Sequence, residues 1–198
     1  MGLDINYADG QTPLDEDEKE GLLIHTITTR GELDEFEQQN IEQAIQWVMM
    51  RSLKPQTLLT EKFICNLHVK MYGDVWKWAG TFRKTNKNIG VDKWQIAADL
   101  KYLLDDAQYW AANSTYPPEE IAVRFKHRIV SIHCFPNGNG RHSRLMADMI
   151  IEKLFRLPVF TWGAGNRINS DEVRTAYLSA MRAADRGDIQ PLLAFARS

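Results

Sequence analysis

Apolar residues recur with a helical period along most of the chain. Thr29 and Glu32 have the spacing of a capping box, and the apolar stripe behind them predicts a helix over 30–51. Thr60 is suited to cap a second helix, which Gly73 would end. Further stripes predict helices over 96–110, 117–132, 141–156 and 170–181, and a last one from 188 onward. The pattern therefore predicts an all-α fold.

One segment departs from this period. Between Trp76 and Trp94 the chain reads as two short extended arms around Asn86-Lys87-Asn88, which predicts a small β-hairpin. Residues 1–30 are turn-rich and then strongly acidic, with few apolar positions. We therefore expect an N-terminal arm over 1–30, followed by one domain over 31–198.

Composition narrows the function classes. The 24 Lys and Arg against 26 Asp and Glu give a net charge of −2. The protein therefore has no overall positive electrostatic field that would attract the phosphate backbone of nucleic acid. The 2 cysteines, Cys65 and Cys134, have neither a zinc spacing nor a disulfide framework. No apolar run is long enough to span a membrane, and the polar N-terminus does not resemble a secretion signal. We expect a cytoplasmic protein with no nucleic acid or membrane as partner.

The segment from Ile132 to Arg144 combines features of a phosphate site. Two glycines and a helix N-terminus present backbone N–H groups to an anion. Arg141 and Arg144 lie on one face of the first helical turn, and guanidinium groups match phosphate geometry. His133, directly before the loop, can take a proton from an attacking hydroxyl. The combination predicts phosphoryl or nucleotidyl transfer.

The whole string resembles the signature of the Fic family, His-Pro-Phe-x-(Asp/Glu)-Gly-Asn-Gly-Arg-x-x-Arg. The residues at motif positions are His133, Phe135, Gly138, Asn139, Gly140, Arg141 and Arg144. The stretch from Trp78 to Arg83 is similar to the family's WAGxxR segment, and 183–195 is similar to its closing helices. Glu37-Gln-Gln-Asn-Ile and Asn88-Ile-Gly-Val resemble the subgroup called mobile mystery protein B.

This resemblance implies an all-α Fic-type helical bundle with a β-hairpin flap, acting as a protein adenylyltransferase. His133 would deprotonate a Tyr, Thr or Ser hydroxyl, which attacks the α-phosphate of ATP, so AMP is transferred and pyrophosphate leaves. A protein target, or the chain itself, would accept the AMP. The implied nucleotide-binding residues are Phe135, Asn137, Gly138, Asn139, Gly140, Arg141 and Arg144, with Asn139 adding a side-chain donor. The implied target-binding flap residues are Thr85, Asn86, Lys87, Asn88 and Ile89.

Two positions depart from the family pattern. Cys134 replaces a proline, and Asn137 replaces the acidic residue that binds magnesium in the family. An amide oxygen carries no charge, so the affinity for Mg²⁺ or Mn²⁺ should fall. The alternatives are a Fic-fold phosphotransferase, an enzyme that removes AMP, and a nucleotide-binding module with weakened catalysis.

Many relatives carry an inhibitory helix with the pattern (Ser/Thr)-x-x-x-Glu-(Gly/Asn). Glu20-Gly21 matches its second half, although Glu16 stands where the pattern has Ser or Thr. The resemblance thus marks Glu20 as the inhibitory glutamate of the arm. Glu32 matches the first half from Thr28, but it is also the acid of the predicted capping box.

Overall fold

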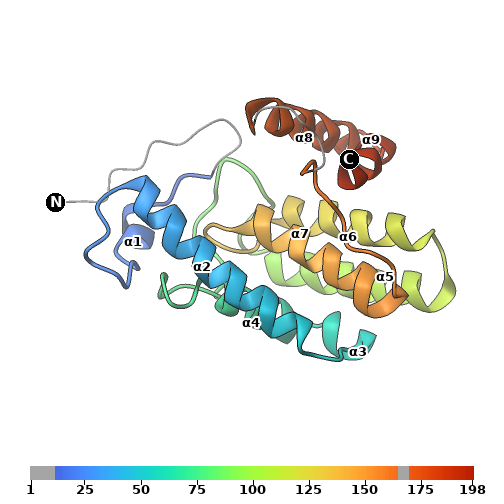
Figure 1. Cartoon of the computed structure of the whole chain (residues 1–198), viewed down its shortest axis with the longest axis horizontal. Helices are drawn as coiled ribbons and strands as arrows, with labels where there is room; N and C mark the ends of the chain where they lie inside the picture. Colours follow the sequence, from blue (N-terminus) through green and yellow to red (C-terminus); the bar gives the residue numbers. More distant parts are fainter. Residues whose placement is uncertain (1–11, 165–169) are drawn as a thin grey trace.

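The fold is a helical bundle, seen in a computed structural model that describes residues 12–164 and 170–198 (Figure 1). Residues 1–11 of the predicted arm lie outside this part of the chain. The helices are α1 (Glu16–Lys19), α2 (Arg30–Met49), α3 (Pro55–Leu58), α4 (Glu61–Tyr72), α5 (Ile96–Asn113), α6 (Pro118–Ile132), α7 (Asn139–Met149), α8 (Ser170–Asp185) and α9 (Gln190–Arg197). A π-helical turn, Ile150–Leu154, continues α7.

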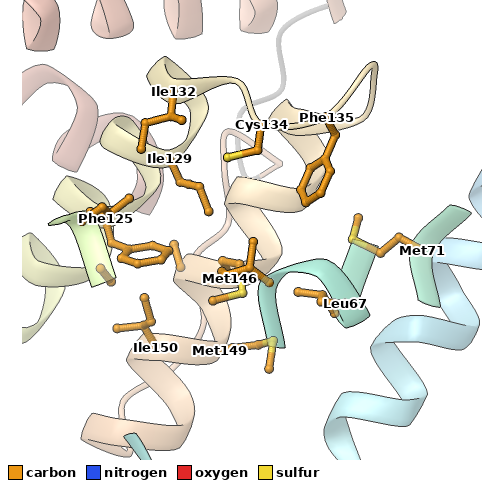
Figure 2. Close-up of a cluster of buried hydrophobic side chains, with 14 of the residues drawn as sticks. Leu67, Met71, Phe125, Ile129, Ile132, Cys134, Phe135, Met146, Met149 and Ile150 are labelled. Carbon is orange, nitrogen blue, oxygen red and sulfur yellow. The ribbon is translucent and has the colours of Figure 1, made fainter. Parts of the chain in front are cut away.

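Helix α7 lies at the centre of the bundle. The pair α2–α4 lies on one side of it, and α6 followed by α5 lies on the other, with α8 and α9 paired above (Figure 1). Met146, Ala147 and Met149 of α7 are buried against α4 and α6, and Met146 is completely enclosed. Figure 2 shows this core beneath the loop that joins α6 to α7, with the Phe135 ring pointing down into it and the Cys134 side chain pointing toward Ile129. The core therefore supports the loop from below.

The start of α2 confirms the capping box. The Thr29 hydroxyl accepts a hydrogen bond from the Glu32 N–H at 3.3 Å, and the Glu32 carboxylate accepts from the N–H groups of Thr28 and Thr29. These contacts satisfy N–H groups that have no partner within the helix. They also lower the pKa of Glu32, because the backbone N–H groups favour its charged form.

The hairpin expected between Trp76 and Trp94 is not formed: the described residues of this segment contain no paired strands. The two flanks of the segment bond instead to the end of α6. The N–H of Arg83 donates to the carbonyl of Cys134 at 2.9 Å, and that of Val91 donates to Ile132 at 3.4 Å. Because these N–H groups are used on the neighbouring helix end, residues 81–91 form a loop that lies over it.

The arm is fastened to the bundle after α1. Leu22 forms an isolated antiparallel bridge with Trp76, with backbone bonds from Leu23 N–H to Val75 and from Lys77 N–H to Gly21. The Trp78 indole N–H also donates to the Glu18 carbonyl at 2.9 Å. No helix in the described part of the chain combines the length and apolar character of a membrane span.

Candidate active site

His133 ends α6 in a left-handed backbone conformation. Its φ is 57°, which residues other than glycine adopt rarely and at some cost. The carbonyl of His133 accepts a hydrogen bond from Arg83 Nε at 2.6 Å, and the same guanidinium donates to the carbonyls of Thr85 and Val91. Arg83 thus joins the 81–91 loop to the strained residue and holds both in place.

The imidazole of His133 is buried and neutral. Burial, and next the charge of Arg83, lower its pKa to about 4, so it is unprotonated at pH 7. Its Nε2 lies 3.1 Å from the Thr12 hydroxyl. Its Nδ1 is buried with no hydrogen-bond partner within residues 12–164 and 170–198. A neutral imidazole in this state is suited to accept a proton.

The loop after His133 is fixed by side chains below it. The Asn139 amide bonds to both backbone groups of Phe135, with its oxygen accepting at 3.0 Å and its nitrogen donating at 2.8 Å. Phe135 is fully buried and stacks on His68, with ring centroids 3.8 Å apart. His68 in turn donates from Nε2 to the Asn137 carbonyl, because its Nδ1 accepts from the Gly80 N–H. Phe135 and Asn139 therefore shape the loop from within.

The two glycines of the loop, Gly138 and Gly140, differ in whether the protein has room for a side chain. Gly138 has a φ of 77°, and a Cβ there would lie 2.5 Å from the Tyr72 ring. A Cβ on Gly140 would meet no protein atom within 4 Å. Glycine inside a helix costs about 1 kcal/mol relative to alanine. Packing does not explain why Gly140 is a glycine in spite of this cost. Its missing side chain leaves space at the N-terminus of α7, where a ligand can approach the backbone.

Two arginines flank that space. Arg141 Nη2 pairs with Glu37 Oε2 at 2.5 Å, and Glu37 also accepts from the Trp76 indole N–H at 2.7 Å. The Arg144 guanidinium lies over the Tyr177 ring, 4.6 Å from its centroid. Its Nε is buried and has no hydrogen-bond partner among the residues that the structure describes. An anion would satisfy Arg144 there.

A cavity of about 910 Å³ opens between these groups and α8. It is lined by His133, by the loop from Asn137 to Arg141, and by Arg144. Its opposite wall comes from α8, where the apolar Val173, Tyr177, Leu178 and Met181 stand beside the charged Arg174, Arg182 and Asp185. Cavities of this size, with apolar side chains and several polar groups, accommodate nucleotide-sized ligands. Phosphates fit the helix N-terminus, and a base fits the apolar side chains of α8.

The segment that carries this site matches a known protein family. Residues 58–151, which contain the whole loop, match the model of the Fic/DOC family. The chain contains a Fic domain. The resemblance to the mobile mystery protein B subgroup, based on residues 37–41 and 88–91, stays a prediction.

Curated relatives of this Fic domain are insect proteins named protein adenylyltransferase Fic. The one from Drosophila grimshawi is 30% identical over 149 residues, which cover 73% of this chain and 29% of the relative. The one from Aedes aegypti is 24% identical over 159 residues, covering 78% and 30%. The chain thus spans less than a third of the length of the curated relatives it matches.

Solved structures share the fold at lower identity. BepC from Bartonella tribocorum, with bound AMPPNP, has a TM-score of 0.69 at 16% identity and covers 92% of this chain and 97% of its own. A fragment of Fic-1 from C. elegans has a TM-score of 0.65 at 22% identity and covers 80% and 46%. At these identities the likeness concerns the fold of the Fic domain alone.

The predicted flap residues of the Fic domain divide into two groups. Asn88 and Ile89 line the cavity. Thr85 and Lys87 face the arm, where Thr85 donates to Asp15 at 2.6 Å and the nearly enclosed Lys87 pairs with Asp15 and Glu18. The remaining member, Asn86, bonds within the loop to Asp92 and to the Lys93 N–H. The arm therefore lies on the predicted target-binding face.

Asn137 is not prepared as a metal ligand. Its side-chain oxygen accepts from the Gly138 N–H at 2.6 Å, and its nitrogen donates to the Thr12 carbonyl at 3.4 Å. Over the described ranges, no group of three His, Cys, Asp or Glu residues comes together to hold a metal ion. The protein groups present do not fit a dedicated magnesium site.

The carboxylate that reaches the loop is not the one marked from the sequence. Glu20 is exposed at the end of α1, whereas Glu37, on α2, is 3% exposed and pairs with Arg141. A signal for Glu37 exists in the sequence, because it lies four residues from both Leu33 and Ile41 on the buried stripe of α2. A charged residue on such a stripe is almost always paired. Arg83 is the arginine of the WAGxxR-like segment, but that resemblance did not indicate its anchoring role.

Proposed function

We propose that this Fic domain is a protein adenylyltransferase, which moves AMP from ATP to a Tyr, Thr or Ser hydroxyl of a protein. The observation that carries the proposal is the neutral His133 beside a cavity whose floor is the N-terminus of α7 and whose edge holds Arg144. The names of the curated relatives and the AMPPNP in a neighbour's structure support the same reaction.

The chain's own groups divide the work. The neutral His133 accepts the proton of the target hydroxyl as its oxygen attacks the α-phosphorus, and pyrophosphate leaves. The free N–H groups at the start of α7 receive phosphate oxygens, and Gly140 lets them approach. Arg144 pairs with a terminal phosphate, while Arg141, held by Glu37, adds positive charge from a fixed position. Removing one such donor typically costs about 3 kcal/mol of transition-state stabilisation.

A divalent ion, Mg²⁺ or Mn²⁺, would be held here mainly by the phosphates of ATP. Asn137 offers one neutral oxygen that is already bonded to Gly138, so this metal contact is weaker than a carboxylate would make it. The same observation favours the second candidate, a nucleotide-binding module with slow turnover. Asn137→Asp separates the two. A transfer rate that rises by tenfold or more marks a competent site limited by its metal, and an unchanged zero rate favours the module.

The loop 81–91 is the proposed flap, which would hold a target segment against Asn88 and Ile89 by backbone bonds. Because the arm occupies this face, we propose that the arm inhibits the domain. We also propose a cytoplasmic location, where the two free thiols stay reduced. The inhibitory role of Glu20 stays a prediction. Glu20→Gly is expected to raise self-modification, and no change would remove Glu20 from the inhibitory segment.

The first experiment measures the intact mass of the full chain after incubation with ATP and Mg²⁺ or Mn²⁺. The wild type is compared with His133→Asn, which keeps a residue tolerant of the left-handed conformation but cannot accept the proton. His25→Ala, at an exposed histidine, is the matched control. Added AMP that is lost only with His133→Asn supports the proposal. A phosphate-sized addition would instead indicate a phosphotransferase.

A further inference from the structure

Thr12 lies where the acceptor hydroxyl of the reaction would have to lie. Its side-chain oxygen is 3.1 Å from His133 Nε2, although the two residues are 121 positions apart in the sequence. Thr12 is only 7% exposed and forms part of the cavity wall together with Asn137 and Gly138. A threonine hydroxyl therefore sits between the candidate base and the candidate phosphate loop.

A continuous set of contacts keeps Thr12 in this position. The Thr12 carbonyl accepts from Asn137 Nδ2 at 3.4 Å, and the next carbonyl, that of Pro13, accepts from Lys87 Nζ at 3.3 Å. Asp15 accepts from Thr85 and pairs with Lys87 at 2.9 Å. The arm is thus held by the loop on one side and by the phosphate loop on the other, as a bound target segment would be.

The chemistry around Thr12 also suits an acceptor. The charged groups that face His133 are Arg83 and Lys87, and both disfavour a proton on the imidazole. With its proton on Nδ1, the neutral ring presents a lone pair from Nε2 to the Thr12 hydroxyl. The α-phosphate of a nucleotide on the α7 N-terminus would then lie on the open side of Thr12, toward the cavity that both residues line.

Resting on the function proposed above, we propose that Thr12 is an intramolecular AMP acceptor of this chain. The Thr12 oxygen forms a bond to the α-phosphorus of ATP, the bond from that phosphorus to the bridging oxygen of the β-phosphate breaks, and pyrophosphate leaves with its electron pair. The hydroxyl proton passes to His133 Nε2. The balance needs only ATP, and nothing is oxidised or reduced.

Modification at this position changes the arm. Thr12 is enclosed, so an AMP group on its oxygen occupies the cavity until the arm moves away. The bonds of Asp15 and Glu18 to Lys87 then have to break for a second nucleotide to enter. Self-modification at Thr12 is therefore expected to stop at one AMP per chain and to open the site to outside targets.

The test is peptide mapping by mass spectrometry of the full chain, after incubation with ATP and Mn²⁺. Wild type is compared with Thr12→Val, which keeps the shape but removes the hydroxyl, and with Thr12→Ser, which keeps a hydroxyl. Thr115→Val, at an exposed threonine outside the cavity wall, is the matched control. The reaction is run over a hundredfold range of protein concentration, because an intramolecular rate does not depend on concentration.

The expected result is one AMP on Thr12 in wild type and in Thr115→Val, at a rate that is independent of dilution. In Thr12→Ser the AMP is found on the substituted hydroxyl, and in Thr12→Val total incorporation falls by at least about tenfold. AMP found only on other residues overturns the acceptor role of Thr12 but keeps the adenylyltransferase. The same conclusion follows if labelled AMP reaches only proteins of an added lysate. No transfer to the chain or to lysate proteins overturns the proposed function as well.

Discussion

At the scale of single residues, the state of His133 sets the pH range of the reaction. Its pKa is lowered to about 4, by burial first and then by Arg83, whereas an ordinary histidine titrates near 6.5. A base with the lowered pKa stays unprotonated as the pH falls from 7 to about 5. We expect the initial rate of AMP incorporation to be nearly constant over that interval and to drop only near pH 4. A midpoint near 6.5 would show that His133 is not held in this environment.

Glu37 is a second residue whose removal should be costly. It is almost fully buried and binds both Arg141 and the Trp76 indole, so Glu37→Ala leaves two donors without their acceptor. Breaking a buried pair of this kind costs about 3 kcal/mol of unfolding free energy. Urea unfolding would measure the loss. Glu35→Ala, at an exposed glutamate of the same helix, should change the stability by less than about 0.5 kcal/mol.

The sequence predicted the candidate site better than the roles within it. His133, Gly140, Arg141 and Arg144 do meet at one cavity, because all four lie within twelve positions around a single helix start. The amide of Asn139, expected to add a side-chain donor for phosphate, bonds to the Phe135 backbone through its oxygen and one of its two N–H groups. Local spacing cannot reveal such a choice, because it depends on which partner is nearer in the folded loop.

At the scale of elements, the longer helices were predictable, whereas the short α1 and α3 and the absence of the hairpin were not. Helical stripes and caps act over a few residues, so the beginning of α2 at Arg30 agrees with the expected position. Paired strands depend on whether their N–H groups find each other or another carbonyl. Here the end of α6 competes for them through Arg83 and Val91. The sequence of residues 76–94 alone does not indicate that these carbonyls at the end of α6 will accept its N–H groups.

The contact between the arm and the 81–91 loop gives an element-scale prediction. Lys87 is the only residue of that loop that pairs with two arm carboxylates among the described ion pairs, and its side chain is 3% exposed. Lys87→Met should free residues 12–20 from the loop while leaving the bundle folded. Hydrogen exchange of amides 14–20 is expected to accelerate by tenfold or more.

The control for this experiment is Lys84→Met, at an exposed position of the same loop. Its side chain makes no described ion pair with the arm, so exchange of the arm should stay as in wild type. Equal protection of the arm in Lys87→Met and wild type would mean that the bridge at Leu22 alone holds the arm down.

At the scale of the whole molecule, buried histidines make the fold sensitive to acid. Burial lowers the pKa of His133 and His142 to about 4 and that of His68 well below its ordinary value. Between pH 6.5 and 4 the unfolded chain binds protons at these positions that the folded chain does not. Each histidine therefore costs up to about 1.4 kcal/mol of stability per pH unit as the pH falls through this range.

One buried acid acts in the opposite direction. Burial raises the pKa of Asp148 to about 6, so near pH 5 the folded state holds a proton that the unfolded state has released. Asp148 offsets roughly the stability loss caused by one of the three histidines, so the folding stability still falls as the pH falls. Thermal unfolding across this pH range measures this loss. His142→Gln, which keeps a donor for the Ile64 carbonyl, should flatten the slope, whereas His25→Ala should not.

The bridge between Leu22 and Trp76 makes the arm a tether. When Thr12 leaves His133, the chain is still fastened roughly ten residues further on, and a flexible segment of that length keeps its free end at an effective concentration in the millimolar range. An outside protein that binds the flap with micromolar affinity must compete with this internal ligand at every encounter. After cleavage of the chain between Thr12 and Gly21, the released segment would diffuse away and no longer compete at millimolar effective concentration. The apparent KM for an outside target should therefore fall.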